Sequence, residues 1–174
     1  MKRLSLMNYL LCILLIALGV VSRIVIHVPN FTPILSIALL SGIYIKNRFI
    51  IAIPILIMLI SDLYIGSHII APWVYFPIAV ICLIGYFSKN NTFSIISYSM
   101  LSSILFFIIS NFGVWFSGGY GYSIEGLITC YIAAIPFFKN TLISTVLFSS
   151  FIHLVYSVIN SIIKNKQSEK ILEN

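Results

Sequence analysis

Side chains that can bind a polar group are few in this chain, and some of them stand in pairs at helical spacing. Arg23 and His27 are four positions apart, so on a helix they share one face and could hold an anionic ligand group. Asn111 and Trp115 repeat this spacing and would offer an amide and an aromatic ring from one face. Asp62 is the first acidic residue of the chain, and it could pair with Arg23 or contact a ligand itself. These residue types are typical of a small-molecule binding site.

Further polar and aromatic residues lie close to these pairs in the sequence. Three glycines between Gly118 and Gly121 would let the chain turn back over the helix that carries Asn111, as a lid over a site would. The candidate ligand-binding residues are Arg23, His27, Asn30, Asp62, His68, Asn111, Trp115, Tyr120, Tyr122 and Glu125.

The same residues also have purely structural interpretations. Arg23 could extend its guanidinium to a membrane surface, or it could form a structural ion pair with Asp62. Trp115 and its neighbouring tyrosines could belong to an aromatic belt at the membrane interface. Asn111 could hydrogen-bond between helices. The residue types alone leave these alternatives open.

Signatures of catalysis are scarce. The chain contains no H-E-x-x-H, G-x-S-x-G, Walker or EF-hand motif. Asp62, His68 and Glu125 could act as acid and base groups, but no nucleophile stands beside them at a suitable spacing. The ten basic residues are scattered singly between apolar runs, unlike a nucleic-acid-binding patch. We therefore expect no enzyme, no catalytic residue, no metal, no cofactor and no nucleic-acid partner.

The amino-acid composition indicates the class of protein to which these residues belong. Of the 174 residues 60% are hydrophobic and only 8% are charged, and the mean hydropathy is +1.10. A soluble domain carries about 25% charged residues. The chain has no linker, low-complexity tract or internal repeat. We therefore predict an all-α polytopic membrane protein with a single integral membrane domain over residues 1–174.

A helix that spans the membrane needs about 20 apolar residues. This length limits which of the uncharged runs can cross the membrane. The run from Glu125 to Phe138 is short, contains Pro136 and is followed by Lys139, so we expect a re-entrant or interfacial helix over 125–138. Residues 164–174 form a polar tail. Six transmembrane helices are expected at roughly 4–26, 32–46, 48–65, 71–88, 92–116 and 139–163.

Orientation follows from lysine and arginine in short loops, which stay on the cytoplasmic side. Basic residues occur at both ends of the chain, between the second and third spans, and at Lys89 between the fourth and fifth. Six crossings then leave both termini and the tail in the cytoplasm, and the candidate residues on the outer side. We expect a multi-pass protein of the inner (cytoplasmic) membrane.

Several motifs resemble a family of small bacterial integral membrane proteins, classed as transport proteins, whose domain DUF6580 has no assigned function. The resemblance runs from Arg23 to Phe148 and rests on P-N-F-x-P, S-D-x-x-x-G, N-F-G-V-W and I-P-F-F-x-N-T in combination. It names no substrate. The positions that match the family pattern are Pro29, Asn30, Phe31, Pro33, Asp62, Gly66, Asn111, Trp115, Tyr131, Pro136, Phe137 and Asn140.

The expected architecture is also similar, more distantly, to the substrate-binding S components of energy-coupling-factor vitamin transporters. That resemblance implies six helices, cytoplasmic termini and a vitamin pocket near the outer face, closed by loops. It also implies a coupling subunit or ATPase module as partner. The first predicted helix lacks the A-x-x-x-A pattern with which many S components dock to their coupling subunit.

Three functions from different classes follow. The first is a transport protein, or an S-component-like substrate-binding subunit, for a small organic molecule such as a vitamin or cofactor precursor. The alternative is a structural or assembly subunit of the membrane, in which the polar cluster only ties helices together. A membrane-embedded enzyme is the least favoured. The expected partners of the first are the lipid bilayer, the small-molecule ligand and the coupling module.

Overall fold

A computed structural model describes residues 6–25, 28–45, 50–66 and 68–172, with side chains from residue 13 to residue 162 of those ranges. Within them the chain forms six helices and no strand, so the predicted all-α fold is confirmed. The helices are α1 (Leu6–Val25), α2 (Ile34–Ile45), α3 (Ala52–Ile65), α4 (Ala71–Phe87), α5 (Thr92–Phe116) and α6 (Ile124–Leu172).

Local sequence signals fix the beginnings of two helices. The Asn91 side chain accepts a hydrogen bond from the Ser94 amide at 2.8 Å, which satisfies one of the free donors at the start of α5. A proline in the first turn begins α4, where its missing amide hydrogen costs nothing. The helix bounds predicted at 71–88 and 92–116 therefore agree closely with those of α4 and α5.

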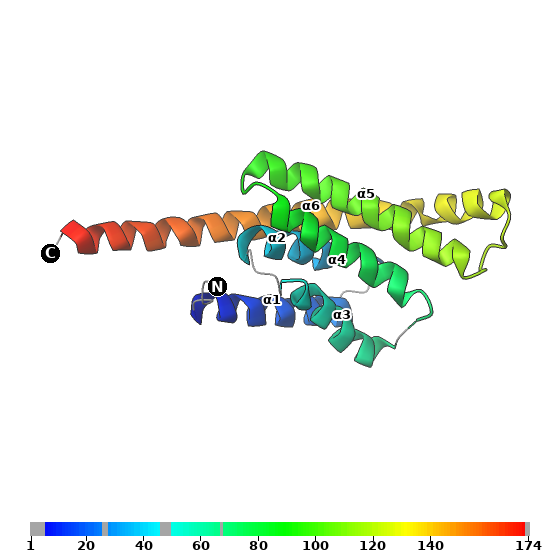
Figure 1. Ribbon diagram of the computed structural model, residues 1–174, viewed down its shortest axis with the longest axis horizontal. Helices are drawn as coiled ribbons and strands as arrows, with labels where there is room; N and C mark the ends of the chain where they lie inside the picture. Colours follow the sequence, from blue (N-terminus) through cyan, green and yellow to red (C-terminus); the bar gives the residue numbers. More distant parts are fainter. Residues whose placement is uncertain (1–5, 26–27, 46–49, 67, 173–174) are drawn as a thin grey trace.

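Successive helices run in alternating directions (Figure 1). The beginning of α1 and the end of α6 lie at one end of the bundle. The loops after α1, α3 and α5 lie toward the opposite end, which we call the site end. This alternation brings together the helix ends on which the sequence carries its polar candidates.

Helix α2 occupies the centre of the bundle. All of its residues from Ile34 to Ile43 are buried, and it contacts each of the other five helices. The most extensive packing joins α5 to α6, α2 to α4, and α1 to α3. The core therefore surrounds a short helix that is apolar on every face, as expected of a fully buried helix.

Helices α2 and α4 approach each other closely because each presents a glycine to the other. A methyl group added at Gly42 would overlap the backbone carbonyl of Cys82, and one at Gly85 would overlap the carbonyl of Leu39. Small residues at a helix contact allow backbones to approach in this way.

The predicted division of the last apolar region is wrong. Helix α6 continues without interruption through the residues expected to form a separate short helix over 125–138 and a span over 139–163 (Figure 1). Pro136 lies inside this helix, where it removes only one backbone hydrogen bond of a long ladder. Lys139 has an exposed position, so its charge does not require the helix to end there. At 49 residues, α6 is much longer than a span of about 20 residues requires.

Two helices of the described chain meet the length and hydropathy expected of a membrane crossing. They are Thr92–Phe116 and the Ile124–Ile162 part of α6. The apolar helices α2, α3 and α4 have 12, 14 and 17 residues. At about 1.5 Å per residue they are shorter than a hydrocarbon core of about 30 Å.

Candidate functional site

An ion pair joins α1 to α3 at the site end of the bundle. Nη2 of Arg23 lies 2.8 Å from Oδ1 of Asp62, and the two side chains are only 13% and 6% exposed. Oδ1 has no aligned hydrogen-bond donor, so its contact with Arg23 is chiefly ionic. The predicted pairing is confirmed. Because the guanidinium is largely buried, Arg23 does not extend to the surface as the alternative interpretation required.

Further polar contacts complete the surroundings of this pair. The hydroxyl of Tyr75, on α4, donates to Oδ2 of Asp62 at 2.5 Å. Nη1 of Arg23 donates to the hydroxyl of Ser61 and to the carbonyl oxygen of Met58, at 2.5 and 3.4 Å. A buried ion pair is stable only when such hydrogen bonds satisfy its remaining polar atoms. The network thus ties α1, α3 and α4 together and neutralises the charge of Arg23.

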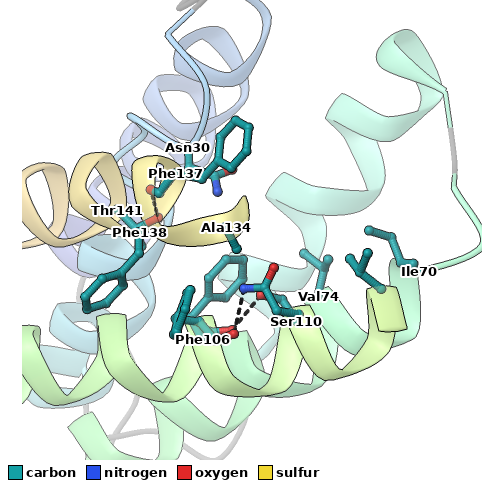
Figure 2. A pocket seen from close by; sticks show the side chains of 12 residues that line it. Asn30, Ile70, Val74, Phe106, Ser110, Ala134, Phe137, Phe138 and Thr141 are labelled. Carbon is teal, nitrogen blue, oxygen red and sulfur yellow. Dashed lines mark hydrogen bonds between the residues drawn. The ribbon is translucent and has the colours of Figure 1, made fainter. Parts of the chain in front are cut away.

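A first cavity, of about 140 Å³, lies between α4, α5 and α6 and is called here the outer cavity. In Figure 2, Asn30 and Phe137 lie on one side of it and Phe106 and Ser110 on the other, with Ile70 and Val74 of the α4 region beyond. Asn111 is a further lining residue, and its amide nitrogen donates to the carbonyl of Phe107 at 2.7 Å. The wall is thus mainly aromatic and aliphatic, with a few polar groups. The remaining lining residues are Phe107, Val114, Ala134, Phe138 and Thr141.

A second cavity, of about 120 Å³, adjoins the first and is called the inner cavity. Arg23 is the only charged side chain among the described residues that line either cavity. Asn30, Val74, Phe106 and Thr141 line both. The residues that line the inner cavity alone are Arg23, Thr32, Ile34, Leu35, Met58, Ile78 and Thr145.

The loop between α1 and α2 reaches these cavities because α6 holds its backbone. Asn30 has φ of 58°, a left-handed conformation that asparagine adopts more readily than most residues. The carbonyl of Pro29 accepts a hydrogen bond from Nδ2 of Asn140 at 3.0 Å, and that of Asn30 accepts one from the Ser144 hydroxyl at 3.4 Å. The P-N-F-x-P and I-P-F-F-x-N-T motifs, far apart in the sequence, therefore meet in the fold.

The structure gathers only part of the predicted site. Arg23, Asn30 and Asn111 line the cavities, and Asp62 lies directly behind Arg23. His27 lies outside the described residues. The remaining predicted residues, which line neither cavity, are His68, Trp115, Tyr120, Tyr122 and Glu125.

Trp115 instead stabilises the turn between α5 and α6. Its indole nitrogen donates to the carbonyl of Ser123 at 3.3 Å, and its ring meets that of Tyr122 edge to face. Trp115 and Asn111 share a helical spacing, as predicted, but only Asn111 contributes to the outer cavity. Glu125 and His68 are exposed.

Sequence reasoning missed most of the cavity wall, which consists of aromatic and hydroxyl-bearing residues of α5 and α6. One signal was available: Thr141, Thr145 and Ser149 recur every four positions, a spacing that places them on one face of a helix. All three are buried. Small hydroxyl-bearing residues at such spacing are typical of the packed face of a membrane helix.

Among the described residues, no three histidine, cysteine, aspartate or glutamate side chains lie close enough together to share a metal ion.

The comparisons with known proteins bear on family alone. No curated protein and no solved structure matches the chain. A family model described as a family of unknown function, DUF6580, matches residues 4–168. This is the family whose motifs the sequence resembles. The match covers nearly the whole chain, which therefore belongs to the DUF6580 family.

Proposed function

We propose that this chain is a multi-pass membrane protein that binds a small organic molecule, such as a vitamin or cofactor precursor, and takes part in its transport. The observation that carries the proposal is the pair of adjoining cavities, whose aromatic and aliphatic walls hold a few polar groups, as ligand sites do. The proposed partners are the bilayer, the small molecule and a coupling subunit or ATPase module.

The outer surfaces of the helices support a membrane environment. Leu63, Phe87 and Phe93 are each more than 80% exposed, and many other large apolar side chains are at least half exposed. Water-soluble monomers rarely expose apolar patches of large area. Crossings by the short helices α2, α3 and α4 would need a locally thinner bilayer, or loops shielded by protein.

The volumes of the two cavities limit the size of the ligand. Each cavity is smaller than the roughly 300–1,000 Å³ of sites for drug-sized ligands.

We expect a small molecule to co-purify in mild detergent and to be identifiable by mass spectrometry. When added back, it should raise the melting temperature as its concentration exceeds its dissociation constant. Repeated preparations that contain no small molecule would instead favour a structural subunit, as would a melting temperature that no candidate changes.

Asn111→Ala tests the outer cavity. The variant should bind the co-purified molecule more weakly by roughly 0.5–1.5 kcal/mol, the usual net value of one hydrogen bond. Its melting temperature without ligand should stay near that of the wild type, because the Asn111 amide bonds only to its own helix in the structure. Asn160→Ala, at an exposed position of α6, is the matched control. Equal affinities of the two variants would contradict a ligand contact.

Trp115→Ala is expected to behave in the opposite way. The variant should lose stability through the α5–α6 turn and keep the affinity of the folded fraction, since Trp115 lines neither cavity. A loss of affinity with unchanged stability would place Trp115 in the binding site.

Labelling of single cysteines in intact cells tests the six-crossing topology. Lys89 and Tyr120 belong to loops at opposite ends of the bundle (Figure 1). A cysteine at position 120 should react with a membrane-impermeant maleimide, whereas cysteines at positions 89 and 164 should react only after the membrane is permeabilised. Labelling of position 164 from outside would contradict an even number of crossings.

A further inference from the structure

Four side chains separate the outer cavity from the inner cavity. Asn30 comes from the loop between α1 and α2, Val74 from α4, Phe106 from α5 and Thr141 from α6. Each of them lines both cavities. Side chains common to two adjoining cavities lie between them, so the four surround the boundary from four different elements.

The backbone at this boundary is fixed on two sides. Asn30 is held by the hydrogen bonds from α6 to its own carbonyl and to that of Pro29. Thr141 is only 4% exposed, and its hydroxyl donates to the carbonyl of Phe137 at 3.0 Å (Figure 2). Phe106 is the largest of the four side chains and projects from the opposite helix, α5. Its ring is therefore the bulkiest group at the boundary.

On the far side of the boundary, the inner cavity is lined mostly by buried side chains. Thr145, which lines only the inner cavity, is 0% exposed, whereas Ser110 of the outer cavity is 9% exposed. Arg23 also lines only the inner cavity, and its charge is balanced by Asp62. A molecule held in the outer cavity would reach Arg23 by crossing this boundary.

We propose that Asn30, Val74, Phe106 and Thr141 form a neck that joins the two cavities into one passage and selects ligands by width. The proposal rests on the proposed function, in which the cavities hold the ligand. It deepens that function by assigning specificity to the four residues. A molecule narrow enough to pass the Phe106 ring would reach Arg23, and a wider one would stop in the outer cavity.

Thiol modification rates test the neck without any ligand. The background is the full chain with Cys12, Cys82 and Cys130 replaced by alanine, purified in detergent. Thr145→Cys then reports entry to the inner cavity, with uncharged N-ethylmaleimide as the probe. Phe106→Ala should widen the neck and raise the rate at position 145 roughly tenfold or more, because the probe no longer waits for local opening of the neck. Val74→Phe should narrow the neck and lower the same rate.

Two reporter cysteines and two substitutions away from the neck serve as controls. Ser110→Cys reports entry to the outer cavity, which the neck residues also line, so a neck substitution should change the rate at position 145 more than the rate at position 110. Ser99→Cys is 0% exposed and lines neither cavity, so its rate reports general loosening. The matched substitutions are Phe93→Ala and Val155→Phe, both at exposed positions. Neither should change the rate at position 145.

Two outcomes would overturn the neck. One is a rate at position 145 that responds to neither Phe106→Ala nor Val74→Phe. The other is an equal increase at positions 99 and 145, which indicates loosening of the bundle. If Phe106→Ala fails to fold, the decrease expected from Val74→Phe decides alone. Because these rates need no ligand, a confirmed neck in a protein that never binds a small molecule would refute the proposed function only.

Discussion

Asp62→Asn should lower the free energy of unfolding by about 3–5 kcal/mol, because it leaves a buried guanidinium without its counter-charge. The amide keeps an oxygen for the Tyr75 hydroxyl, so the change removes the charge and little else. Arg23 is only 13% exposed. Hydration by water therefore cannot compensate the guanidinium for the lost ion pair.

The double variant distinguishes an ion pair from two independent charges. Arg23→Met leaves the Asp62 carboxylate unpaired and should also be strongly destabilising. Arg23→Met combined with Asp62→Asn leaves no buried charge, so it should be more stable than Asp62→Asn alone. Unfolding in mixed detergent micelles, followed by fluorescence of the two tryptophans, supplies the three free energies. Additive losses would show that the contact contributes no coupling energy.

Lys139→Met is the control for this cycle, since Lys139 carries a single charge at an exposed position. It should unfold close to the wild type, because surface charges contribute little. If it were as destabilised as Arg23→Met, which changes the net charge by the same amount, the loss would reflect net charge and not the buried pair.

Sequence reasoning predicted the helices well because their boundaries depend on local signals. Lys89 and Asn91 separate two long apolar runs, and α4 and α5 end and begin beside them. The pairing of Arg23 with Asp62 was also predictable, since an unpaired charge at that depth is costly. Both inferences need only neighbouring residues or the rarity of charge in this chain.

The centre of the bundle could not be predicted in the same way. Helix α2 is apolar on every face, so its sequence does not indicate which face packs or which helices surround it. The contact of Asn140 with Pro29 joins positions 111 residues apart. Phenylalanines such as Phe106 look the same in sequence whether they face lipid or a cavity, because both surroundings are apolar.

The continuity of α6 escaped prediction for a different reason. Pro136 and Lys139 are each a common signal for the end of a helix. Here the proline is placed within a helix whose remaining backbone hydrogen bonds continue on both sides, and the lysine is exposed. Local signals were outweighed by the packing of α6 against α5 and α2.

Gly85→Ala is expected to be the most damaging change of one small residue in the core. A new methyl group at position 85 would overlap the carbonyl oxygen of Leu39, so α2 and α4 must move apart. The substitution gains at most about 1 kcal/mol of helix propensity. Overpacking typically costs about 1–3 kcal/mol, and more where backbone must shift, as it must here. The clash should therefore outweigh the gain.

Gly42→Ala meets the facing helix in the same region, and the pair gives a sharper test. Once either alanine has moved α2 away from α4, the second new methyl group overlaps less with the facing backbone. The double variant should therefore lose less stability than the sum of the two single losses. Gly119→Ala is the matched control, because the only neighbour within 4 Å of its new methyl group is the carbonyl oxygen of Val114, at 4.0 Å. All four proteins are compared by the same detergent unfolding. A Gly85→Ala variant as stable as Gly119→Ala would show that α2 and α4 are not in close backbone contact.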